Sequence, residues 1–90
     1  MVISMNEEEL YKLRSKVFHK LLEFDEEDQC RGQMAAASGC GKDEEVFTKL
    51  WEYLNDEKTS KTRNDIAEFI LEFDDEFQNR VSNNINNDKE

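Results

Sequence analysis

The sequence predicts an all-α fold, specifically a small antiparallel helical bundle of three long helices and one short helix. Proline is absent from the chain. Apolar residues recur at the i, i+3, i+4 spacing of amphipathic helices in several segments, and no segment shows the strict alternation of a half-buried strand. The connections between these segments are short, so neighbouring helices are expected to run in opposite directions.

The length and composition predict one domain with a small core. A chain of 90 residues buries only about 60 to 65% of the surface that its unfolded form exposes. Although 38% of the residues are charged, six Phe, two Tyr and one Trp provide enough bulky apolar surface for a folded body. We expect a single helical domain over residues 1–82 and a flexible polar C-terminal tail over residues 83–90.

The first helix has a well-defined predicted start. Asn6 is a good N-cap, and Glu9 stands where a capping box places an acidic residue. The segment is expected to continue to about Glu27, because one stripe of apolar residues persists along it: Leu10, Leu13, Val17, Leu21 and Phe24.

Two further helices are expected in the middle of the chain. The alanine-rich segment from Gln29 to Ser38 predicts the short helix, which Gly39 and Gly41 would end. The segment from Asp43 to Asp56 predicts a longer helix with one apolar face, formed by Val46, Phe47, Leu50, Trp51 and Leu54.

The last helix is expected to follow a polar loop over residues 55–61, with Thr62 or Ser60 as its N-cap. Between Asp65 and Glu76 the chain has six acidic residues and no basic one. The apolar residues of this segment, Ile66, Phe69, Ile70, Phe73 and Phe77, share one helical face. Most of the acidic residues share the opposite face and form a predicted stripe of Asp65, Glu68, Glu72, Asp75 and Glu76.

Two apolar residues are candidate anchors for a partner at this stripe. Leu71 falls outside both stripes and has acidic residues as helical neighbours, an arrangement similar to the apolar centre of an interface hot spot. Tyr53 lies at the edge of the preceding helix's apolar face, and tyrosine tolerates both buried and wet surroundings. The predicted partner-binding residues are therefore Asp65, Glu68, Leu71, Glu72, Asp75, Glu76 and Tyr53.

No motif predicts catalysis, a cofactor or a metal site, so we expect a protein that is not an enzyme. The segment around Gly41 lacks the first glycine and the hydroxyl residue of a phosphate-binding loop. A calcium loop that began at Asp25 would have Cys30 at its required glycine. Cys30, Cys40 and His19 are too few and too separated for a zinc site or an activated thiol. The sequence leaves open whether the two cysteines pair.

The net charge of −10 restricts the classes of partner. Binding to nucleic acid draws on phosphate neutralisation by Lys and Arg, so direct nucleic-acid binding is not expected, and anionic membranes should repel the chain. The same charge attracts basic proteins and speeds their association. No secretory signal or membrane-spanning apolar run is visible, and two cysteines do not indicate a disulfide framework, so we expect a cytoplasmic protein.

The leading functional hypothesis is an acidic helical protein that inhibits a basic partner by covering its positive surface. In size and charge the chain is similar to immunity proteins, which neutralise bacterial nuclease toxins. One alternative is a nucleic-acid mimic of phage or mobile-element origin. Another is a structural or adaptor homodimer in which the line Lys12, Lys16 and Lys20 meets the acidic stripe of a second copy.

Overall fold

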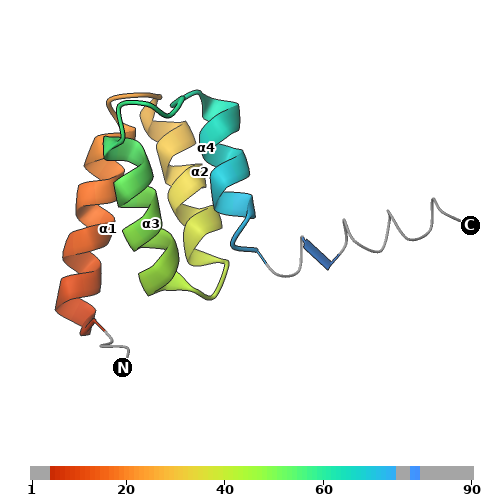
Figure 1. Ribbon diagram of the computed structural model, residues 1–90. Coiled ribbons are helices and arrows are strands. Elements are labelled where there is room, and N and C mark those ends of the chain that lie inside the picture. Colours follow the sequence, from red (N-terminus) through yellow and green to blue (C-terminus); the bar gives the residue numbers. More distant parts are fainter. Residues whose placement is uncertain (1–4, 75–77, 80–90) are drawn as a thin grey trace, which may run out of the picture.

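The computed structural model describes residues 5–74 and 78–79. This part of the chain contains four helices and no strand: α1 (Glu7–Leu21), α2 (Glu27–Ser38), α3 (Asp43–Asn55) and α4 (Arg63–Leu71). The α1–α2 and α3–α4 connections lie at one end of the molecule, and the α2–α3 turn lies at the other (Figure 1). The all-α class and the helical bundle predicted from the sequence are confirmed.

The apolar face of α3 forms the centre of the core. Helix α3 packs against each of the other three helices, and most extensively against α1. Phe47 is fully buried and is the largest fully buried side chain among the described residues. Every helix contributes to this one cluster of buried apolar side chains: Val17, Leu21, Cys30, Ala37, Val46, Phe47, Leu50, Leu54, Ile66 and Ile70.

The predicted N-cap Asn6 is confirmed, and of the two candidates for the last helix, Thr62 and Ser60, Thr62 is the N-cap. The Asn6 side-chain oxygen accepts a hydrogen bond from the Glu9 N–H at 2.8 Å. The Thr62 hydroxyl accepts from the Asp65 N–H at 3.1 Å and donates to the Asp65 carboxylate at 2.8 Å. Both residues therefore satisfy N–H groups that the first turn of a helix leaves without a partner.

The first helix ends earlier than predicted, at Leu21 and not near Glu27. The chain turns over residues 22–25, where Phe24 is 39% exposed and lies outside the core that its spacing predicted. Asp25 accepts a hydrogen bond from the Glu26 N–H at 2.8 Å, so its side chain favours a new helix start over continuation. Helix α2 then begins at Glu27 and spans 12 residues, which makes it longer than the predicted short helix.

The last helix is also shorter than predicted. Helix α4 spans nine residues and ends at Leu71, whereas the sequence pattern continued to Phe77. Its last turn contains no basic residue and is followed by an acidic run, and negative charge is unfavourable beside the carbonyl groups at a helix C-terminus. Asp75 and Glu76, as well as the predicted tail over residues 83–90, lie outside the described residues.

The Thr62 cap gives a direct test of the start of α4. Thr62→Ala is expected to lower the free energy of unfolding by about 1 kcal/mol, because the Asp65 N–H loses its acceptor. Urea titration followed by circular dichroism measures the change. Ser38→Ala, which removes an exposed hydroxyl at the last residue of α2, is the matched control. Equal stability of both variants would contradict the capping role.

Candidate functional site

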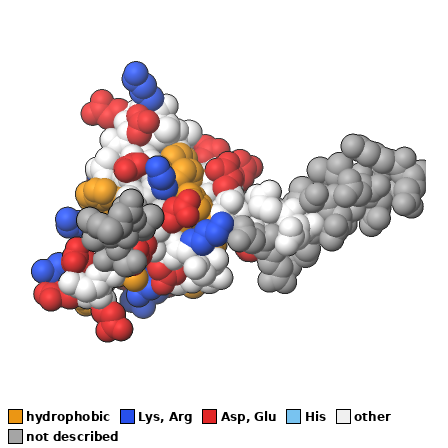
Figure 2. All heavy atoms as spheres, turned by 60° about the horizontal axis from the view of Figure 1, so that its bottom comes forward, with side chains coloured by type: hydrophobic (Ala, Val, Ile, Leu, Met, Phe, Trp, Pro, Cys, Tyr) orange, Lys and Arg blue, Asp and Glu red, His pale blue; other side chains and the backbone are white. Residues whose placement is uncertain are grey.

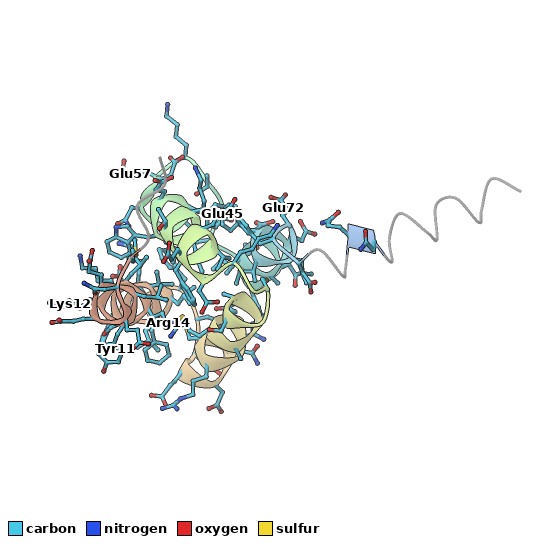
Figure 3. All side chains as sticks on the ribbon, turned by 90° about the horizontal axis from the view of Figure 1, so that it is seen from below. Tyr11, Lys12, Arg14, Glu45, Glu57 and Glu72 are labelled. Carbon is cyan, nitrogen blue, oxygen red and sulfur yellow. The ribbon has the colours of Figure 1, made fainter. Side chains whose placement is uncertain are left out.

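The described part of the predicted acidic stripe lies along α4. Asp65, Glu68 and Glu72 are three and four residues apart and therefore share one face of the helix. Glu68 and Glu72 are exposed, and neither forms an ion pair with another described residue. Glu72 projects from α4 away from the other helices (Figure 3). Among the described residues, these two carboxylates are therefore exposed and outside any ion pair.

Asp65 has a structural role in addition to its charge. It is half-buried, and its carboxylate accepts the hydrogen bond from the Thr62 hydroxyl. Hydrogen bonds from Ser60 and from Thr62 lower the pKa of Asp65. The residue therefore remains charged at neutral pH, but its hydrogen bonds hold it at the start of α4.

Elsewhere on the described surface, acidic and basic side chains are mixed. Figure 2 shows charges of both signs interspersed over one end of the molecule. The basic residue of α4 is Arg63 at its first position, which is paired with Asp25. The chain has no Lys or Arg between Asn64 and Asn79, so the rest of the exposed face of α4 carries only negative charge. Ion pairs between described residues on the other helices include Lys12–Glu8, Arg14–Asp43, Lys20–Glu23, Arg31–Glu27 and Lys49–Glu52.

Tyr53, one of the two predicted anchors, is held by contacts within the chain. Its hydroxyl donates a hydrogen bond to the Ser60 carbonyl oxygen. Its ring stacks on Phe69 of α4, with the ring centroids 4.5 Å apart. Burial raises the pKa of Tyr53, and the charges of Asp65 and Glu68 raise it further. Tyr53 thus attaches the α3–α4 loop and α4 to α3, beside the acidic face.

Leu71, the other predicted anchor, is half-buried and lies on the side of α4 that borders α2. It contributes to an open groove of about 380 Å³ between α2 and α4. Leu71 is therefore part of a concave apolar surface, whereas the helical wheel predicted an isolated leucine among acids. The residues that line the groove are Gln29, Gly32, Gln33, Ala36, Arg63, Asn64, Ala67, Ile70 and Leu71.

Gln33 lines this groove and was missed by the sequence reasoning. Its side chain is 7% exposed, and neither Nε2 nor Oε1 has a hydrogen-bond partner among the described residues. An unsatisfied buried polar group costs about 1–3 kcal/mol. A signal was present in the sequence, because Gln33 shares a helical face with Cys30 and Ala37, two residue types that are often buried.

Arg63, which lines the groove at the start of α4, forms an ion pair with Asp25 of the α1–α2 connection. The Nε and Nη2 atoms of Arg63 each donate a hydrogen bond to the Asp25 carboxylate at 2.8 Å. Asp25 precedes α2 and Arg63 begins α4, so the pair joins the α1–α2 connection to α4. The hydrogen bond from Arg63 lowers the pKa of Asp25, and the Glu26 N–H lowers it further.

The two cysteine side chains are packed against other residues of the fold. Cys30 and Cys40 carry thiols and not a shared disulfide. Burial raises the pKa of the Cys30 thiol, and the nearby charges of Asp25 and Glu27 add to this effect. The Cys40 thiol donates weakly to the Ala36 and Ile70 carbonyl oxygens. Within the described residues, no group of three or more His, Cys, Asp and Glu side chains is arranged to hold a metal ion.

Comparisons with protein-family models, curated proteins and solved structures return no match for this chain. Among the described helices, none combines the length and the apolar character needed to cross a bilayer.

The proximity of Tyr53 to the acidic face can be measured. In a Tyr11→Phe background, where Tyr53 is the remaining tyrosine, Glu68→Gln is expected to lower the pKa of Tyr53 because it removes a nearby negative charge. Absorbance of the phenolate gives the titration. Glu45→Gln, at the opposite end of α3, is the control. If Glu68→Gln leaves the midpoint of the Tyr53 titration unchanged, Glu68 does not lie close enough to Tyr53 to affect its charge.

The Asp25–Arg63 pair predicts a pH dependence of stability. The folded-state pKa of Asp25 is lowered from its usual 3.8, so its stabilisation is present above that value and is lost as the pH falls through the folded-state pKa. Arg63→Gln should raise the pKa of Asp25, as NMR titration of the carboxyl carbon would show. Arg31→Gln, which breaks an exposed pair with Glu27, should have less effect. Equal effects of the two variants would refute the assignment.

Proposed function

We propose that this chain is a small acidic binding protein that inhibits a basic partner protein by covering the partner's positive surface. The observation that carries the proposal is the exposed face of α4, where Glu68 and Glu72 form no ion pair with another described residue. Like charges on one short helix repel each other and weaken it. An approaching cationic surface would relieve this repulsion.

The class of partner follows from the charge that it must present. A nuclease binds phosphates and therefore requires a positive surface at its nucleic-acid site. A toxin nuclease of a bacterium fits this requirement, and the proposed role is then that of a cytoplasmic immunity protein. Electrostatic attraction would speed the encounter, and apolar contacts beside the carboxylates would hold the complex.

The proposal assigns different roles to the predicted site residues. Glu68 and Glu72 provide exposed charge for the partner, and Asp65 adds charge at the start of the helix. Leu71 provides apolar contact from the groove beside them. Tyr53 acts indirectly, because its stacking on Phe69 holds α4 in position. Asp75 and Glu76 remain predicted extensions of the acidic face.

The decisive test uses a panel of purified basic nucleases that includes the product of any adjacent gene. We expect the chain to inhibit one nuclease at an equimolar ratio. Neutralising the face with Glu68→Gln and Glu72→Gln should slow association with that nuclease by about three- to tenfold at low salt, because steering depends on these charges. Stopped-flow fluorescence and a nuclease assay measure both effects.

The matched control is the pair Glu9→Gln and Glu57→Gln, which removes the same charge from exposed residues outside α4. Figure 3 shows Glu57 well separated from Glu72. Equal slowing by both pairs would mean that net charge, and not this face, controls binding. Similar salt-dependent release of every basic protein in the panel would indicate a nucleic-acid mimic instead.

A further inference from the structure

The groove between α2 and α4 has features that its role in the fold does not explain. Gly32 lies inside α2, a helix in which glycine is less favourable than alanine. A Cβ atom added at Gly32 would meet nothing within 4 Å, and Gly41 is the described glycine with a positive φ. Neither backbone geometry nor packing within the described chain therefore requires glycine at this position.

The floor of the groove is suited to close approach of a helix. Gly32 and Ala36 are four residues apart on α2, and Ala67 and Leu71 are four residues apart on α4. The small residues Gly32, Ala36 and Ala67 allow another helix to approach closely, and Leu71 offers it an apolar contact. The apolar floor is thus prepared for a helix that lies along it.

Gln33 adds a polar requirement to this floor. Its buried amide offers one donor atom, Nε2, and one acceptor atom, Oε1, without a partner among the described residues. A helix uses its own main-chain N–H and C=O groups internally, so an incoming helix would have to present a side chain. The carboxamide of Gln or Asn is complementary, because it carries both an acceptor and a donor.

The charges beside the groove indicate which side chains should flank the apolar face of a bound helix. Glu68 and Glu72 are exposed next to Leu71 on α4, and Asp28 is exposed one turn before Gly32 on α2. The positive charge of Arg63 is already paired with Asp25, and that of Arg31 with Glu27. The borders therefore favour positive residues on the occupant and disfavour a second copy of this chain, whose net charge is −10.

From these observations, we infer that the α2–α4 groove binds a basic amphipathic helix of the partner, with a Gln or Asn in the middle of its apolar face paired to Gln33. This inference rests on the proposed function and specifies how the basic partner is held. Glu68 and Glu72 contact the lysines or arginines of the helix, and the groove takes its apolar side chains.

The test uses two synthetic helical peptides of Leu and Lys in the i, i+3, i+4, i+7 pattern, which differ only in a central Leu→Gln change. Each is titrated into the full ¹⁵N-labelled chain. We expect chemical-shift changes at Gly32, Ala36, Ala67 and Leu71 and at the Gln33 side-chain amide. The Gln peptide should bind about tenfold more tightly than the Leu peptide, because it pairs with the buried amide.

Variants of the chain make the result specific. Gln33→Leu should reverse the preference between the two peptides. Gly32→Leu should weaken both by filling the floor, whereas Ala35→Leu, at an exposed position of the same helix outside the groove, should leave them unchanged. Circular dichroism and thermal unfolding establish that each variant is folded. If Gln33→Leu does not fold, the Gly32→Leu and Ala35→Leu comparison decides the location.

The possible failures are distinguishable. Shifts confined to residues around Glu68 and Glu72 would overturn the groove but leave the acidic binding face intact. Equal affinity of the two peptides would overturn the pairing with Gln33. Absence of binding by both peptides at low salt would count against the proposed function itself. A dimer of the chain alone, detected by sedimentation and dissociated by Gly32→Leu, would assign the groove to a second copy and overturn the basic helix.

Discussion

The packing of α3 against its three neighbours is the interaction on which the rest of this small fold depends. Phe47 and Leu50 are fully buried at its centre, and every other helix places apolar side chains around them. Truncation of a buried Phe to Ala typically costs about 3–5 kcal/mol, which is a large fraction of the stability of a domain this size. The position of α4, and therefore of its acidic face, is fixed through this core and through the stacking of Phe69 on Tyr53.

Strong local signals allowed the starts of α1, α3 and α4 and the apolar face of α3 to be predicted. Helix α3 ends within one residue of its predicted limit, because its apolar spacing is clear and a polar loop follows it. Asn6 and Thr62 were identified because their side-chain oxygens can accept backbone N–H groups at a helix start. The ends of α1 and α4 were missed for one physical reason. An acidic run fits the apolar periodicity of a helix, so the pattern does not show where the helix stops. Whether the helix ends there depends on the charge beside its C-terminal carbonyl groups and on tertiary partners such as Arg63.

The candidate site was predictable only where periodicity determines exposure. Glu68 and Glu72 are exposed because they lie opposite Ile66 and Ile70, a relation that the helical wheel contains. A helical wheel of α4 alone cannot show which other helix lies beside it. It therefore predicted Leu71 to face solvent, whereas Leu71 borders α2. Tyr53 is half-buried, as expected for a residue at the edge of the apolar face of α3. Its hydrogen bond to the Ser60 carbonyl oxygen could not be predicted, because it depends on the path of the α3–α4 loop.

The acidic face and the groove carry related costs to stability. Repulsion between Glu68 and Glu72, four residues apart, weakens α4 by a few tenths of a kcal/mol. Glycine in place of alanine at position 32 weakens α2 by about 1 kcal/mol, and the unsatisfied Gln33 amide adds a cost of similar size. A short chain has little stability to offset such terms. All three costs lie on α2 and α4. One ligand relieves two of them: its cations offset the repulsion between the carboxylates, and its carboxamide pairs with the Gln33 amide. This coincidence of location and chemistry is the reason for treating the face and the groove as parts of one binding surface.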